Sequence, residues 1–83
     1  MSENPDVQGR LSFEWDQAAE RLEIHGDDRG LELLVSMIQT LVANGKNDHC
    51  HLMTPAWGGV ELTEEQENVA ATLVNHVKIM RWG

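Results

Sequence analysis

Four histidines are the residues of this 83-residue chain whose type and spacing most suggest chemistry. His49 and His51 are two positions apart, so on a β-strand both imidazoles would project from the same side, ~7 Å apart. Such a pair ligates zinc when a further histidine, His25 or His76, or a carboxylate completes a tetrahedron. The same pattern is more often a pair of solvent-facing strand residues. A metal site on His49, His51 and His76 is therefore the minor alternative, and no metal or cofactor is predicted.

Cys50, the one cysteine, lies between these two histidines. A single cysteine excludes an internal disulfide and a paired-cysteine metal knuckle. On a strand its thiol would point away from both histidines and toward the core, where it acts as a small apolar filler. The chain also lacks a GxSxG elbow, a phosphate-binding glycine loop and an HExxH helix. We therefore predict no catalytic residues and no enzyme activity.

Acidic residues dominate the charge, with 14 carboxylates against 6 basic side chains and a formal net charge of −8. This balance argues against binding to nucleic acid or to an anionic membrane, both of which need lysine and arginine. Glu61, Glu64, Glu65 and Glu67 fall within seven positions without a basic residue. They form either an ordinary solvated surface or a patch that docks on a basic cleft of a partner.

Two tryptophans are candidates for interface anchors or core plugs. Trp57 lies in a loop bounded by Pro55 and Gly58, and Trp82 lies at the chain end beside Met80. The candidate partner-binding residues are thus Trp57, Glu61, Glu64, Glu65, Glu67, His76, Lys78 and Trp82.

The elements that must position these residues follow from periodicity. Alternating apolar residues predict strands over 11–16 and 21–26, joined as a hairpin. Apolar residues from Leu31 to Val42 at i, i+3, i+4 spacing predict an amphipathic helix. Asp27 and Asp28 favour its start, and Asn44-Gly45 its end.

The second half of the chain predicts two more strands, over 48–54 and about 72–82. The stretch 60–75 is ambiguous among helix, loop and strand, because Thr63 and Gln66 resemble a capping box while β-branched residues oppose a helix. Residues 1–10 are polar, contain Pro5 and Gly9, and predict a disordered lead-in to a single domain over 11–83.

These elements predict an α+β fold: an antiparallel sheet of about four strands in the order ββαββ, with one helix across one face. The helix would cover Leu11, Phe13, Leu22, Ile24, Leu52, Val77 and Ile79. The open face would carry Glu14, Glu23, His25, His49, His51, His76, Lys78, Met80 and Trp82. We expect this polar face to meet a ligand, a partner or, in a homodimer, a second copy of the chain.

Neither an apolar run long enough to span a membrane nor a secretory h-region in Met1–Arg10 is present. The expected location is therefore the cytoplasm.

Three blocks resemble a known family: HLMTPAWGG at His51–Gly59, ELT at Glu61–Thr63 and NHVKIMRW at Asn75–Trp82. Over about Leu22–Trp82 the chain is similar to the immunity protein 32 family of bacterial polymorphic toxin systems. The resemblance implies a mostly β domain with a helix, without enzymatic activity, that binds and neutralises a cognate toxin C-terminal domain in the producing cell. Many such toxins are basic nucleases. The leading hypothesis is thus an antitoxin, and the alternatives are a histidine-rich metal-binding domain and a homodimeric interaction module.

Overall fold

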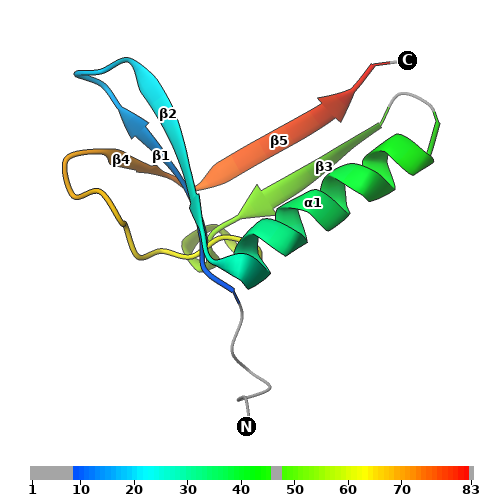
Figure 1. Ribbon diagram of the computed structural model, residues 1–83, viewed down its shortest axis with the longest axis horizontal. Coiled ribbons are helices and arrows are strands. Elements are labelled where there is room, and N and C mark those ends of the chain that lie inside the picture. Colours follow the sequence, from blue (N-terminus) through cyan, green and yellow to red (C-terminus); the bar gives the residue numbers. More distant parts are fainter. Residues whose placement is uncertain (1–8, 46–47, 83) are drawn as a thin grey trace, which may run out of the picture.

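The computed structural model describes residues 9–45 and 48–82. Its elements are β1 (Leu11–Asp16), β2 (Arg21–Gly26), α1 (Asp28–Ala43), β3 (Asp48–Met53), the short 3₁₀ helix η1 (Pro55–Trp57), β4 (Thr72–Val74) and β5 (His76–Arg81). All strand pairs are antiparallel (Figure 1). The predicted α+β class with the order ββαββ is confirmed. The single sheet of about four strands that the sequence predicted is wrong, because the strands form two separate sheets.

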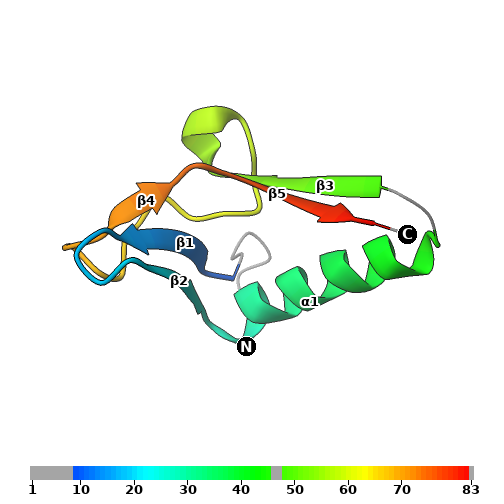
Figure 2. The same ribbon diagram turned by 90° about the horizontal axis from the view of Figure 1, so that it is seen from above.

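The strands divide between two sheets. One sheet has three strands in the order β2-β1-β4, and the other pairs β3 with β5. The two sheets diverge as the arms of a V, and α1 runs along the arm formed by β3 and β5 (Figure 1). From above, α1 lies on one side of β3 and β5 and η1 on the other (Figure 2).

Asn75 separates β4 from β5, so the strand predicted over 72–82 serves both sheets. The backbone carbonyl of Asn75 accepts a hydrogen bond from the Thr54 N–H at 3.0 Å, and its side-chain oxygen accepts one from the Thr54 hydroxyl at 2.7 Å. Thr54 is completely buried. This contact between distant segments fixes the point at which the chain passes from one sheet to the other.

The helix has the predicted start and end. Asp27 is the N-cap, and its carboxylate accepts hydrogen bonds from the backbone N–H groups of Gly30 at 2.8 Å and Arg10 at 2.9 Å. After Ala43 and Asn44 the chain turns at Gly45, whose φ of +72° favours glycine. The cap thus also ties the start of α1 to the residue before β1.

One stripe of α1 packs inward. Gly30 and Leu41 are buried, and Leu34 and Met37 pack against a core of Leu11, Phe13, Leu52 and Leu62. Gly30 is required there because a Cβ would lie 1.9 Å from the Arg10 carbonyl oxygen. The helix and the strands therefore meet at van der Waals distance along this stripe.

The ambiguous stretch 60–75 contains no helix; it is a loop until β4 begins at Thr72. Thr63 does not cap a helix, because its N–H and its hydroxyl both donate to the Leu11 carbonyl, at 2.8 and 3.0 Å. Leu62 is 2% exposed. The loop is thus fastened to the three-stranded sheet by long-range contacts.

The expected lead-in over residues 1–10 lies outside the described residues except for Gly9 and Arg10. Within the described part of the chain, no helix combines the length and hydropathy needed to cross a membrane.

Candidate partner-binding surfaces

The outer face of the two-stranded sheet brings together several of the predicted residues. In its register His51 lies opposite Lys78, and Met53 opposite His76. The His51 Nδ1 atom lies 2.8 Å from His76 Nε2, and the His49 and His51 rings meet edge to face with centroids 5.0 Å apart. The sequence prediction of a shared face is confirmed for His49, His51 and His76. It is wrong for His25, which belongs to β2 in the other sheet.

We call His49, His51 and His76 the histidine row. The hydrogen bond between His51 and His76 needs one ring as donor and the other as acceptor. Partial burial, together with the neighbouring His49, His76 and Lys78, lowers the pKa of His51. The neutral imidazole of His51 is therefore favoured near neutral pH.

A metal site on His49, His51 and His76 remains a prediction. Among the described residues, one group has metal-ligating atoms all within 4.8 Å of one another, and it consists of Glu14, Glu23 and His25. The histidine row is not part of that group.

Cys50 faces the core, as its position between the two histidines predicts. It is half-buried and packs against the core cluster. Burial raises the pKa of its thiol, and the carboxylates of Asp48 and Glu61 raise it further. The thiolate needed for nucleophilic chemistry is thus disfavoured.

Glu14 was expected on an open face, and this expectation is wrong. Its side chain is completely buried. Its carboxylate accepts hydrogen bonds from the Ser12 hydroxyl at 2.6 Å and from the backbone N–H groups of Glu67 and Asn68, each at 2.9 Å. The loop that supplies these N–H groups covers this face of the sheet, so Glu14 holds the loop in place.

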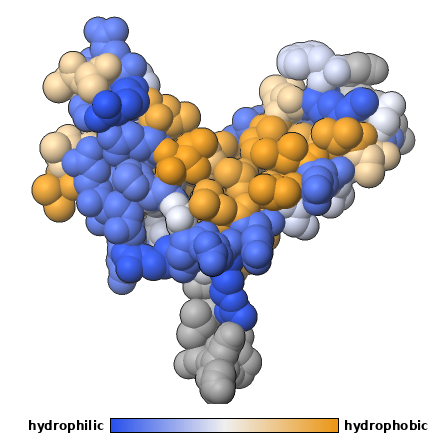
Figure 3. Space-filling view, in the orientation of Figure 1, coloured by the Kyte–Doolittle hydropathy of each residue, from blue (hydrophilic) through white to orange (hydrophobic). Residues whose placement is uncertain are grey.

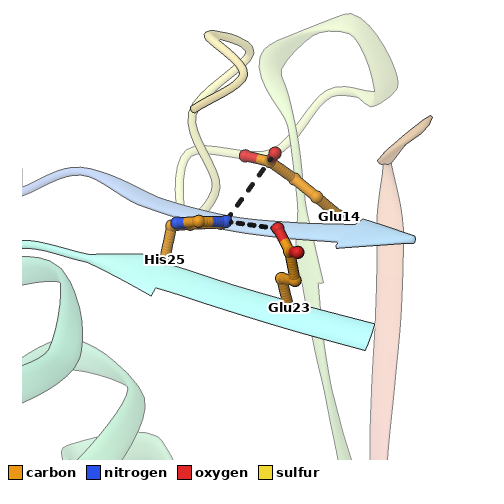
Figure 4. A group of neighbouring side chains, drawn as sticks. All are labelled: Glu14, Glu23 and His25. Carbon is orange, nitrogen blue, oxygen red and sulfur yellow. Dashed lines mark hydrogen bonds and ion pairs between the residues drawn. The ribbon is translucent and has the colours of Figure 1, made fainter. Parts of the chain in front are cut away.

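Glu23 and His25 complete a polar cluster with Glu14. His25 Nε2 lies 2.9 Å from a Glu23 oxygen and 3.9 Å from a Glu14 oxygen (Figure 4). Asn68 and Arg21 also donate to the Glu23 carboxylate. The carboxylate oxygens are therefore already occupied by donors from the protein, and the cluster is a structural contact between sheet and loop.

The ionisation of this cluster follows from its contacts. Burial alone would raise the pKa of Glu14, but hydrogen bonds from Glu67, Ser12 and Asn68 outweigh it and leave the pKa below its ordinary value. The hydrogen bond between His25 and Glu23 lowers the pKa of Glu23 and raises that of His25. The cluster thus favours two carboxylates facing one imidazolium.

The acidic stretch 61–67 is only partly free. The Glu61 carboxylate accepts a hydrogen bond from the Met53 N–H at 3.1 Å, and Glu67 pairs with Arg10. Glu65 lies 3.6 Å from Arg10, and Glu64 and Glu65 border an open hollow of about 460 Å³ together with Pro55, Val60 and Leu62. Glu64 and Glu65 are exposed and remain available to a partner.

The two tryptophan candidates are exposed but far apart in the fold. Trp57, in η1, is 58% exposed, and its ring centroid lies 6.0 Å from that of His76. Trp82, which follows β5, is 76% exposed. Trp57 therefore extends the histidine row near the start of β5, whereas Trp82 directly follows the other end of the same strand.

The structure also has an open apolar surface that was not predicted from the sequence. Leu22 and Ile24 of β2 were expected beneath the helix, but they are 51% and 47% exposed, so that expectation is wrong. The helix lies along the other arm, which β3 and β5 form (Figure 1). A continuous apolar band therefore crosses the front of the molecule from β2 onto α1 (Figure 3).

We call this surface the apolar face and define it by its six exposed side chains: Leu22, Ile24, Leu31, Val35, Ile38 and Val42. The signal for it was present in the sequence. The apolar arc of the helix includes two parallel stripes, and only one of them packs against the core.

A comparison with protein families identifies the chain. The family model described as Immunity protein 32 matches residues 21–77, more than half of the chain. The chain belongs to this family. No curated protein and no solved structure matches it. The resemblance expected from the sequence blocks is confirmed, and the family indicates a role in immunity against a toxin.

The family match includes both candidate surfaces of this immunity protein. It begins at the first residue of β2, contains all of α1 and β3, and ends within β5. The apolar face and the histidine row thus belong to the part of the chain that carries the family likeness.

Proposed function

We propose that this member of the immunity protein 32 family is an antitoxin that binds a cognate bacterial toxin domain and neutralises it through a protein–protein interface. The family match over residues 21–77 is the observation that carries this proposal. Inhibition by binding needs a rigid complementary surface and no reacting group. A standard interface of about 800 Å² per partner is within the reach of one side of this domain.

The charge of the chain supports a basic toxin domain as the partner. With a net charge of −8, the protein attracts a basic surface at long range and speeds its association. A basic nuclease domain has this property. We place the complex in the bacterial cytoplasm, where the producing cell needs protection, and we include neither nucleic acid nor membrane among the partners.

The residues predicted from the sequence remain candidates for toxin contact. Trp57, His76 and Lys78 share the outer side of the two-stranded sheet, and Glu64 and Glu65 are exposed in the loop. Glu61 and Glu67 already have internal partners, so their substitution would also disturb the fold.

Co-expression tests the proposal. The toxin domain encoded by the gene adjacent to this one is expressed in a bacterial host with and without this protein, and growth and co-purification are measured. We expect growth arrest by the toxin alone, and restored growth with a stable complex when both are present. Persistent growth arrest without a complex would overturn the proposal.

A further inference from the structure

The apolar face leaves large hydrophobic side chains exposed that a folded domain would ordinarily bury. On α1 the exposed residues Leu31, Val35, Ile38 and Val42 follow i, i+4, i+7, i+11 spacing and are 42, 52, 41 and 60% exposed. They run beside the stripe that packs into the core. No segment within residues 9–45 and 48–82 covers them. A helix with two apolar stripes and one covered stripe has a surface suited to a second molecule.

Strand β2 continues this surface. Its apolar residues Leu22 and Ile24 are exposed, whereas Glu23 and His25, which alternate with them, are half-buried beneath the loop. The usual partition of a surface strand is therefore reversed. The apolar band that crosses from β2 onto α1 is continuous (Figure 3).

The charges beside the apolar face favour a basic partner. Asp28, Leu31, Glu32 and Val35 border a hollow of about 300 Å³. Within the described residues neither Asp28 nor Glu32 forms a salt bridge. Two carboxylates beside an apolar stripe suit a protein segment that carries apolar side chains flanked by lysine or arginine.

A second copy of the chain fits this surface poorly. Two helices packed antiparallel about a two-fold axis would place Asp28 and Glu32 of one copy beside the last turn of α1 in the other. That turn contains no basic residue, and it lies at the negative end of the helix dipole. Each copy would also bring a net charge of −8.

We infer that the apolar face binds the toxin domain, and that the toxin presents apolar side chains flanked by basic residues to it. This inference rests on the proposed antitoxin function and assigns its interface to β2 and α1. It differs from the interface predicted from the sequence, which lies on the histidine row, the Trp57 loop and the acidic stretch.

A matched pair of substitutions tests the assignment. Val35→Asp places a carboxylate in the middle of the apolar face. Val69→Asp makes the same chemical change at a residue that is 93% exposed, in the loop that covers the opposite, polar face of the three-stranded sheet. Binding of each purified variant to the toxin domain is measured by calorimetry, and folding is checked by circular dichroism.

We expect Val35→Asp to raise Kd by about 30-fold or more, which is the loss of affinity typical of a central interface residue. We expect Val69→Asp to leave Kd within about threefold of the wild-type value. Equal binding by the two folded variants would overturn the assignment of the face while leaving the antitoxin function intact. Absence of binding by the wild-type protein would instead overturn the proposed function, and the assigned partner with it.

A second pair decides the question if Val35→Asp fails to fold. Glu32→Lys and Glu64→Lys are identical charge reversals at exposed residues, one beside the apolar face and one in the acidic stretch. We expect Glu32→Lys to slow association by about tenfold at low salt, and Glu64→Lys to have a smaller effect. The reverse order would place the toxin on the acidic stretch. A wild-type dimer that Val35→Asp dissociates without weakening toxin binding would assign the face to a second copy.

Discussion

The two faces of the three-stranded sheet divide their residues in opposite ways. On one face Glu14, Glu23 and His25 are covered by the loop over residues 62–71, whose backbone N–H groups donate to Glu14 and whose Asn68 side chain donates to Glu23. On the other face Leu22 and Ile24 have no comparable cover within the described residues. A buried charge and an exposed apolar surface are each unusual, and here they lie back to back.

This difference indicates that the polar face stabilises the fold and that the apolar face is suited to binding a partner. The polar face has an internal partner whose donors satisfy the carboxylates, so its charges stabilise the fold. Burying the side chains of the apolar face would be favourable, and this requires a second molecule. If the protein is the antitoxin proposed above, the second face is where its partner is expected.

The largest expected effect compares two side chains that lie opposite each other on this apolar side. Phe13 is 5% exposed and its register partner Ile24 is 47% exposed. We expect Phe13→Ala to lower the free energy of unfolding by about 3–5 kcal/mol, because it opens a cavity in the core. Ile24→Ala should cost about 1 kcal/mol or less, since half of the side chain is already in water. Urea denaturation measures both.

Equal losses in this pair would break the comparison, because they would mean that Ile24 is packed as tightly as Phe13 and that the apolar face is part of the core. Unchanged m-values would show that neither substitution alters the denatured state.

The next effect concerns the polar face. Glu14→Ala removes a buried acceptor of three hydrogen bonds and leaves the donors of Ser12, Glu67 and Asn68 unpaired. We expect a loss of about 3 kcal/mol in the free energy of unfolding. Glu64→Ala, at an exposed position, should change it by less than about 0.5 kcal/mol. Thermal and urea unfolding provide the measurement, and a Glu14→Ala variant as stable as Glu64→Ala would show that the loop is held by other contacts.

Local patterns predicted much of this fold. The helix, its Asp27 cap and its end at Asn44-Gly45 depend on residues close together in sequence, and so does the hairpin of β1 and β2. The break at Asn75 was not predictable in this way, because Thr54 fixes it from 21 positions away. The loop over residues 62–71 was ambiguous for the same reason: its hydrogen bonds go to Leu11 and Glu14, more than 50 positions away.

The candidate site was harder to predict than the fold. Alternation correctly placed His49 and His51 together and Cys50 toward the core. The alternation of apolar and polar residues also placed Glu14 and Ile24 on opposite faces of the sheet. It did not predict which of the two faces another segment of the chain would cover. That depends on where α1 and the loop pack, which is a tertiary property.

A smaller effect compares the two stripes of α1. Leu41 is 5% exposed, while the adjacent Val42 is 60% exposed. We expect Leu41→Ala to cost about 2–3 kcal/mol, because the cavity it leaves lies against the core. Val42→Ala should be close to neutral for stability, since alanine has the higher helix propensity and little buried area is lost. Chemical denaturation of the two variants distinguishes the stripes, and a large loss for Val42→Ala would contradict an open outer stripe.

The smallest effects compare two histidines, one on each sheet. The hydrogen bond to Glu23 raises the pKa of His25 above 6.5, whereas partial burial and neighbouring positive charges lower the pKa of His51 below 6.5. NMR titration of the imidazole resonances should therefore give His25 the higher pKa of the two. His25→Asn should leave the titration of His51 unchanged, because the two rings lie on separate sheets.

The same shifts predict opposite dependences of stability on pH. The contribution of His25 is fully present below pH 6.5 and is lost as the pH rises through its raised folded-state pKa. The contribution of His51 is present above pH 6.5 and is lost as the pH falls toward its lowered folded-state pKa. In the wild-type protein, His25 therefore makes the free energy of unfolding fall as the pH rises above 6.5, and His25→Asn should abolish this fall. His51 makes it fall as the pH drops below 6.5, and His51→Asn should abolish that fall. If both variants change the pH profile on the same side of 6.5, the polar cluster and the histidine row do not differ in the way their contacts require.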